Sequence, residues 1–195
     1  MSTSTMIRFV QILPEVSEKG DFLLKDLPGS GKRIDLLSRD LAACFDWGPT
    51  VWSKSHLELI AVVGDSKILR FNNPGEDIPL GERAWAELIQ ESLKGNPPKF
   101  VQVADGELED VIQEYNKPPK STIWVLYETG SLIDRCKFNI SEAQNSFMLG
   151  DHRGFDSKTE ELISKYKIGK VSLGKISYLS SHCVVSIISQ FERMV

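Results

Sequence analysis

The sequence has few cysteines, few histidines and no long hydrophobic run. Its three cysteines, Cys44, Cys136 and Cys183, are scattered and make neither a disulfide framework nor a metal-binding pair. The longest apolar runs, such as residues 57–63, have the length of a strand and are far too short to span a bilayer. The first residues lack the charged-then-apolar pattern of a signal peptide. We therefore expect a cytoplasmic protein with no membrane span and no metal centre.

The composition is that of an ordinary globular protein. With 195 residues, 41% of them hydrophobic and a formal net charge of −4, the chain can bury one sizeable core. The mild acidity argues against a general nucleic-acid coat but allows a local basic groove. Because no repeat, low-complexity segment or convincing linker interrupts the chain, we expect one domain over residues 1–195, with residues 1–6 disordered.

Apolar patterns of strand and helix type alternate along the chain. The expected strands are residues 7–13, 57–63, 67–71, 100–103 and 122–127. The expected helices are residues 33–45, 81–94, 108–115, one opened by a capping box at 157–160 and ending near 167, and 180–194. Alternating elements with several fully apolar strands predict an α/β fold with a mainly parallel sheet.

Twice in the last fifty residues, a short apolar strand runs directly into a glycine-bearing loop. The first is residues 147–154 (FMLGDHRG), with Gly150, and the second is residues 171–177 (VSLGKIS), with Gly174. Glycine after a buried strand lets the backbone turn sharply and approach a ligand closely. The two loops predict one small-molecule site built largely from main-chain groups.

Residues 28–33 (PGSGKR) are similar to the end of a phosphate-binding P-loop. That motif needs a glycine where Asp26 stands, and a Ser or Thr for the magnesium ion where Arg33 stands. Asp26 would repel phosphates, which disfavours ATP or GTP hydrolysis. Two interpretations remain: a flexible glycine loop before a helix, or a loop that positions RNA near Arg33 and Asp35.

The first glycine loop also carries Asp151 and His152, which with His182 would form a catalytic dyad or triad. The alternative, which we favour, is that Asp151 braces its loop by accepting backbone N–H bonds, while the two histidines are structural or face RNA. No serine or cysteine nucleophile has a convincing partner, and isolated histidines without ligand spacing do not make a zinc site.

Several segments carry a family resemblance in the same order. They are residues 21–31 (DFLLKDLPGSG), 33–37 (RIDLL), 149–154 (LGDHRG), 172–174 (SLG) and 182–183 (HC). From about residue 7 to its end, and most weakly over 94–120, the chain resembles the archaeal tRNA (pseudouridine(54)-N1)-methyltransferases, the TrmY family of the SPOUT superfamily. The chain departs from the residues common in that family at Lys32, Ser38, Lys175 and residues 177–181. These differences concern substrate recognition more than cofactor use.

The resemblance implies a SPOUT-type α/β fold with a deep trefoil knot over about residues 120–195. It also implies an S-adenosylmethionine site made by the knot loops, and a homodimer whose active sites borrow residues across the interface. The implied reaction is N1-methylation of pseudouridine 54 in the T-loop of tRNA. The alternatives are methylation of another RNA pseudouridine, such as one in ribosomal RNA, and a non-catalytic knotted RNA-binding or assembly factor.

The same resemblance assigns residues to the site. The cofactor-binding residues would be Leu126, Gly150, Leu173, Gly174, Ile176, Ser177, Tyr178 and Cys183. Apolar side chains and close-approaching main chain suit an adenosine moiety. Without the resemblance, Leu126, Leu173 and Cys183 read more simply as core residues.

For the substrate, the resemblance points to Arg33 and Asp35 as the catalytic pair. Arg33 would hold a phosphate or base edge, and Asp35 would accept a proton or hydrogen bond from the pseudouridine ring. The alternative is an Arg/Asp pair at a helix N-terminus, where Asp35 complements the helix dipole. The candidate phosphate contacts are Lys25, Lys32, Arg39 and Arg83.

Overall fold

The computed structural model describes residues 5–47, 52–76, 78–141, 143–151 and 153–194. Its strands are β1 (Met6–Leu13), β2 (Leu57–Val63), β3 (Lys67–Phe71), β4 (Val101–Asp105), β5 (Ser121–Leu132), β6 (Gln144–Leu149) and β7 (Gly169–Ser172). Its α-helices are α1 (Ile34–Phe45), α2 (Gly81–Leu93), α3 (Leu108–Tyr115), α4 (Ser157–Lys165) and α5 (Ser180–Glu192), with short 3-10 helices at Lys54–His56 and Ile133–Arg135. Strands and helices alternate as the sequence predicts.

The strands form one seven-stranded sheet in the order β4-β3-β2-β1-β6-β5-β7. The pairs β1–β2, β1–β6, β5–β6 and β5–β7 are parallel, and only the pairs β2–β3 and β3–β4 are antiparallel. The prediction of an α/β fold with a mainly parallel sheet is therefore confirmed.

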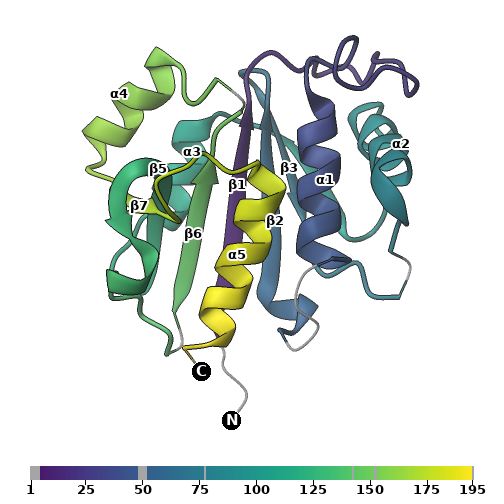
Figure 1. Ribbon diagram of the computed structural model, residues 1–195. Coiled ribbons are helices and arrows are strands. Elements are labelled where there is room, and N and C mark those ends of the chain that lie inside the picture. Colours follow the sequence, from purple (N-terminus) through teal and green to yellow (C-terminus); the bar gives the residue numbers. More distant parts are fainter. Residues whose placement is uncertain (1–4, 48–51, 77, 142, 152, 195) are drawn as a thin grey trace.

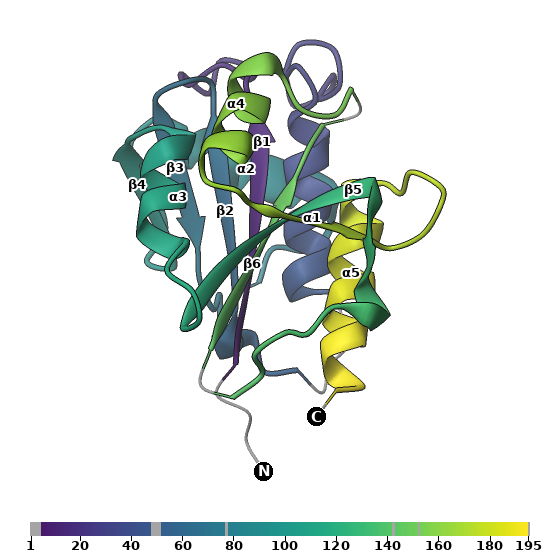
Figure 2. The same cartoon turned by 90° about the vertical axis from the view of Figure 1, so that its left-hand side faces the viewer.

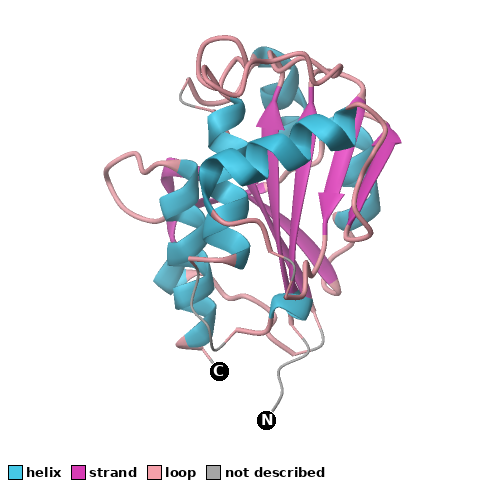
Figure 3. Ribbon diagram, turned by 90° about the vertical axis from the view of Figure 1, so that its right-hand side faces the viewer, coloured by secondary structure: helices cyan, strands magenta, loops and turns pink. Residues whose placement is uncertain are grey.

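Helices cover both faces of the sheet (Figures 1 and 3). Along β1 the side chains alternate, so that Ile7 and Phe9 pack in the cluster with α1, α2 and α5, whereas Val10 and Ile12 pack with α3 and α4. Both faces of the central strands are thus buried, which is why these strands read as continuous apolar runs.

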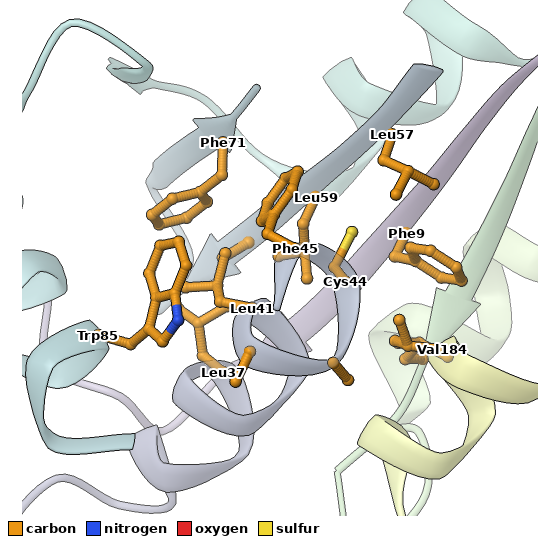
Figure 4. Close-up of a cluster of buried hydrophobic side chains, with 14 of the residues drawn as sticks. Phe9, Leu37, Leu41, Cys44, Phe45, Leu57, Leu59, Phe71, Trp85 and Val184 are labelled. Carbon is orange, nitrogen blue, oxygen red and sulfur yellow. The ribbon is translucent and has the colours of Figure 1, made fainter. Parts of the chain in front are cut away.

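The larger core cluster centres on α1, which lies between α2 and α5 (Figure 4). Trp85 of α2 is fully buried and stacks on Phe45 of α1, with ring centroids 6.1 Å apart. On the other side, Val184 of α5 packs with Phe9 of β1 in the same cluster. This packing fixes α1 and α5 relative to each other, which matters for the site. No helix in the described part of the chain is long and apolar enough to cross a membrane.

Several boundaries differ from the sequence-based expectations by one or two residues, such as those of β4, and three further differences are of more consequence. The chain is placed from Thr5, which is fully buried, and β1 begins at Met6, whose N–H donates to the Ala143 carbonyl at 3.1 Å; residues 1–4 lie outside the described residues. The N-cap of α4 is Asp156, whose carboxylate accepts the Thr159 N–H at 2.8 Å, so the expected capping box is wrong. The third difference is β5, which continues five residues past the predicted end.

Both halves of the extended β5 pair with β7. Val171 of β7 pairs with Leu126 in the first half of β5 and again with Ser131 in the second half. Between the two pairings lies an irregular stretch, residues 127–130, which we call the β5 bulge. A Cβ added to Gly130 would lie 2.7 Å from the backbone of Lys170 and Val171, so only glycine allows this close approach. After the bulge, the far end of β5 turns down beside α5 (Figure 2).

Candidate functional site

A pocket of about 550 Å³ opens where β5, β6 and β7 leave their parallel pairings. Its walls come from the β5 bulge, from the loop between β6 and α4 (residues 150–156, glycine loop 1) and from the loop between β7 and α5 (residues 173–179, glycine loop 2). Arg33 and Leu36 close the side next to α1. Volume and position are typical of small-molecule sites in α/β proteins, which lie at the carboxyl ends of parallel strands.

All eight residues expected to bind a cofactor line this one pocket. They are Leu126, Gly150, Leu173, Gly174, Ile176, Ser177, Tyr178 and Cys183. A Cβ added to Gly150 would lie 2.9 Å from the Gly154 carbonyl oxygen, so glycine loop 1 can fold back on itself only with glycine at this position. The structure therefore brings the two glycine loops, about twenty residues apart in sequence, into a single wall.

Hydrogen bonds from buried strands hold both glycine loops. The fully buried Gln11 of β1 donates its side-chain N–H to the Gly150 carbonyl at 3.2 Å. Asp151 accepts the Arg153 N–H at 2.7 Å, which is the bracing role expected for it. In glycine loop 2, the Ser172 hydroxyl accepts the Gly174 N–H at 3.1 Å. His152 lies outside the described residues, and His182 is exposed on α5.

Charged groups of both signs face the pocket. Glu128 lies in the β5 bulge, and its pKa is lowered by its own backbone N–H and by the Ser177 hydroxyl. Arg153 of glycine loop 1 pairs with Glu15 at 2.5 Å and lies 3.7 Å from Asp151. The pocket can therefore take a ligand that carries positive and negative groups together.

Tyr127 closes the pocket towards α4. Its hydroxyl hydrogen-bonds to the Glu160 carboxylate, and the Lys170 ammonium group lies 4.0 Å from its ring centroid. Burial, followed by the contact with Glu160, raises its pKa. Sequence reasoning missed Tyr127, Glu128 and Arg153. The positions of Glu128, directly after the expected strand, and of Arg153, within a glycine loop, were a usable signal.

Arg33 and Asp35 sit at the start of α1, but only Arg33 lines the pocket. Arg33 has a left-handed backbone, with φ 74°, and caps the helix. Its guanidinium donates to both Asp35 oxygens, at 3.0 and 3.1 Å, and this hydrogen bonding raises the pKa of Arg33. Arg39 also binds Asp35, whose side chain is only 3% exposed. Both carboxylate oxygens of Asp35 are thus engaged by guanidinium groups.

The other candidate phosphate contacts are dispersed. Lys25 and Lys32 are exposed in the segment that leads into α1, and Lys32 directly precedes Arg33. Arg39 is committed to Asp35, and Arg83 on α2 pairs with Glu87 at 3.2 Å. Of the four, only Lys32 directly adjoins the pocket residue Arg33 in sequence.

The glycine-rich segment before α1 is closed by its own carboxylate. Asp26 accepts the backbone N–H groups of Gly29 at 3.2 Å and Ser30 at 2.9 Å. These are the main-chain donors that a nucleotide phosphate would need. The structure therefore supports the interpretation that this segment is not a P-loop.

Behind the pocket wall lies a buried carboxyl group that the sequence reading did not single out. Asp40 of α1 is fully buried, and one of its oxygens accepts the Ser180 hydroxyl at 2.7 Å. The other oxygen, Oδ2, has no hydrogen-bond partner among the described residues. Burial raises the pKa of Asp40 to about 7, and burial likewise raises the pKa of the neighbouring Cys183 to about 12.

Known proteins match the chain over nearly its whole length. Residues 6–194 match a family described as putative SAM-dependent RNA methyltransferase. A protein of Methanococcoides burtonii is 29% identical over 200 residues, covering 96% of each chain. One of Thermococcus onnurineus is 36% identical over 182 residues, covering 85% of this chain and 87% of its own. Both relatives bear the name tRNA (pseudouridine(54)-N(1))-methyltransferase.

Solved structures share the fold at low sequence identity. Archaeoglobus fulgidus Nep1, bound to S-adenosylhomocysteine, has a TM-score of 0.64 at 15% identity and covers 97% of both chains. Ribosomal RNA small subunit methyltransferase E of Neisseria gonorrhoeae, bound to S-adenosyl methionine, has a TM-score of 0.50 at 14% identity, covering 100% of this chain and 68% of its own. The arrangement of strands and helices described above is therefore one that methyltransferases use.

The buried Asp40 should make the free energy of unfolding fall as the pH rises. Its pKa rises from 3.8 to about 7 on folding, so between these values the folded state holds a proton that the unfolded state has lost, and stability falls as pH rises. Asp40→Asn should abolish this component, which amounts to about 2 kcal/mol between about pH 5.5 and 7.5. Urea unfolding of both proteins at the two pH values measures it.

The matched control is Asp134→Asn, because Asp134 is an exposed aspartate. It should leave the pH dependence of the unfolding free energy at the wild-type value. An Asp40→Asn variant with the same pH dependence as the wild type would show that Asp40 does not titrate in this window.

Proposed function

The chain belongs to the family of SAM-dependent RNA methyltransferases, and on that basis we propose that it methylates N1 of pseudouridine 54 in the T-loop of tRNA. The observation that carries the proposal is the pocket, in which the strand ends and both glycine loops meet Arg33. The chain that forms it aligns over 96% and 85% of its length with the two relatives of that name. A tRNA substrate implies a cytoplasmic location.

The residues of the pocket fit S-adenosylmethionine. Leu126, Leu173 and Ile176 offer apolar surface for the adenine ring, and the main chain at Gly150 and Gly174 can reach its polar edge. The ionised Glu128 and the guanidinium group of Arg153 suit the ammonium and carboxylate groups of the methionine part. When bound, S-adenosylmethionine supplies an electrophilic methyl group on a sulfonium.

Transfer of a methyl group to nitrogen requires alignment and a nucleophile that loses its proton. Bound S-adenosylmethionine would give up its methyl group to N1 and leave as the thioether, and the N1 proton would pass to a base. Pseudouridine presents N1–H because its sugar is attached through carbon. The acceptor must enter beside Arg33, the cationic side chain on the α1 side of the pocket.

We assign Arg33 to the acceptor nucleotide, where its free edge can bind a phosphate or a base carbonyl. We assign Asp35 to orienting Arg33, since both of its oxygens are already engaged by guanidinium groups and its side chain is buried. As part of the first turn of α1, Asp35 also complements the helix dipole. Lys25 and Lys32, exposed just before Arg33, would contact the phosphates of the tRNA.

We also propose that the C-terminal part is knotted, with β7 threaded through the segment between β5 and β6. Two observations support this. Leu126 and Ser131, in the two halves of β5, both pair with Val171, and the chain then returns to β6, where the Gln144 N–H donates to the Lys120 carbonyl at 2.9 Å. In addition, Phe138 of the returning segment contacts Phe191 of α5, with ring centroids 5.2 Å apart.

We further propose that the protein is a homodimer. Glycine loop 2 exposes Ile176 (73%), Tyr178 (49%) and Leu179 (50%) at the rim of the pocket, and Leu132 of the neighbouring β5 is 38% exposed. Clustered large apolar side chains on a surface mark an interaction site. A second copy seated there would complete the pocket wall, in keeping with active sites shared between subunits.

The reaction is tested with labelled S-adenosylmethionine and two tRNA transcripts, one with pseudouridine and one with uridine at position 54. We expect label only in the first transcript, because uridine has no N1–H, and nucleoside mass spectrometry should identify N1-methylpseudouridine. Equal labelling of both transcripts would contradict the assignment. Labelling of ribosomal RNA alone would favour a ribosomal substrate, and donor binding without any labelled RNA would favour the assembly-factor alternative.

Variants on the two sides of the pocket should have different effects, one on donor affinity and the other on turnover. Gly150→Ala places a Cβ 2.9 Å from the Gly154 oxygen, so glycine loop 1 must open and donor affinity should fall at least about tenfold by calorimetry. Arg33→Gln should keep donor affinity but lower turnover about 100-fold, because it removes a charged contact to the acceptor.

Gly75→Ala is the control for the glycine, since the Cβ added at Gly75 meets nothing within 4 Å, and Gly75, unlike Gly150, has a left-handed backbone (φ 66°) that makes the control the more strained of the two substitutions. It should bind the donor as the wild type does. Full turnover by Arg33→Gln, or unchanged donor affinity in Gly150→Ala, would contradict the corresponding assignment.

The proposed dimer is tested by measuring the oligomeric state of the wild type and of a variant in the exposed apolar cluster around Ile176. Sedimentation should give the wild type twice the mass of the 21.9 kDa chain, and Ile176→Asp should shift it to the monomer, because a charge in an apolar interface is costly. Leu80→Asp is the control, since Leu80 is equally exposed (75%) but precedes α2, and it should remain dimeric. A monomeric wild type, or a dimeric Ile176→Asp, would contradict this role of the patch.

A further inference from the structure

Asp40 joins the two helices that bound the pocket. Ser180, whose hydroxyl it accepts at 2.7 Å, is the first residue of α5, lines the pocket and lies 140 residues away in sequence. Asp40 belongs to α1, the helix that begins beside Arg33. A single buried hydrogen bond thus ties the helix on the acceptor side of the pocket to the end of glycine loop 2.

The surroundings of Asp40 favour its neutral form. The charged and titratable groups that face it are Arg39 and Asp35 on its own helix, Cys44 one turn further on, and Cys183 on α5. The guanidinium of Arg39 is engaged by Asp35, and the two thiols are neutral, since burial raises the pKa of each. Among the described residues, Asp40 therefore has no cation of its own to balance a charge.

The local hydrogen bonds are too few to stabilise an ionised Asp40. Ser180 satisfies one oxygen, whereas Oδ2 has no hydrogen-bond partner among the described residues and is shielded from solvent. A buried carboxylate needs several donors or a paired cation. Water would have to enter between α1 and α5, or Arg39 would have to leave Asp35, and either movement disturbs the pocket wall.

We propose that Asp40 is a positioning residue for the methyl donor: its neutral carboxyl group holds Ser180 and the first turn of α5 in place as a wall of the pocket, and its ionisation loosens this wall and weakens donor binding. The inference rests on the proposed function, because the donor is the ligand whose affinity should respond.

The expected pH dependence follows from the titration of one group. Below about pH 7 Asp40 is neutral and keeps Ser180 and the first turn of α5 in place. Above about pH 7 donor affinity should fall. If only the neutral form binds, the limit is about tenfold per pH unit, or about 30-fold between about pH 6 and pH 8.5.

The test is calorimetric titration of S-adenosylmethionine into the full-length protein at about pH 6 and pH 8.5. The wild type should lose about 10- to 30-fold in affinity over this range. Asp40→Asn keeps the carbonyl oxygen that accepts from Ser180 but cannot ionise, so it should match the wild type at the lower pH within about threefold and show no loss at the higher pH. Asp40→Ala should bind weakly at both, since the hydrogen bond is gone.

His182→Gln is the control, because His182 is the exposed histidine in the same turn of α5. It should show the wild-type loss of affinity with pH. Asp40→Asn losing affinity like the wild type would overturn the inference, and so would Asp40→Asn binding as poorly as Asp40→Ala at the lower pH. Wild-type binding that does not change with pH would overturn this inference alone, whereas no donor binding at any pH would overturn the proposed function with it.

Discussion

The site depends on the pairing of β7 with both halves of β5. Val171 is held between Leu126 and Ser131, and this fixes where β7 ends and where glycine loop 2 begins. Because β6 pairs with the other edge of β5, glycine loop 1 emerges beside the same bulge. Three segments that are separated in sequence by helices and long connections therefore meet as one pocket wall. The contact of Gly130 with the β7 backbone is tight enough to exclude any side chain there.

In the proposed reaction the acceptor must meet the donor at a defined angle, and the packing of α1 against α5 would supply it. Arg33 sits at the start of α1 and is held by Asp35, while Ser180 opens α5 and is held by Asp40. Both polar contacts lie beside a core in which large apolar side chains lock the two helices to the sheet. In-line methyl transfer gains mainly from such preorganisation, since no metal or covalent nucleophile is needed to explain it.

The sequence predicted those features that depend on neighbouring residues, such as helices, strands and glycine turns. The apolar run of β2 and the pattern of α3 have the predicted bounds, and Gly150 and Gly174 were singled out because glycine marks close backbone approach. The second half of β5 was missed, because the apolar run ends at residue 127 and the later pairing exists only where β7 lies. Asp40 and Tyr127 were missed for the same reason: their roles come from contacts with Ser180 and Glu160, far away in the chain. The catalytic pair and the knot came from family resemblance rather than from patterning.

The most direct measurement is a crystal structure of the protein with S-adenosylhomocysteine. The account predicts the adenine ring between Leu126 and glycine loop 2, main-chain contacts at Gly150 and Gly174, and the thioether sulfur turned towards Arg33, with β7 threaded behind it. A ligand bound elsewhere, or a sulfur atom facing away from Arg33, would contradict the assignment of one pocket to methyl donor and RNA acceptor.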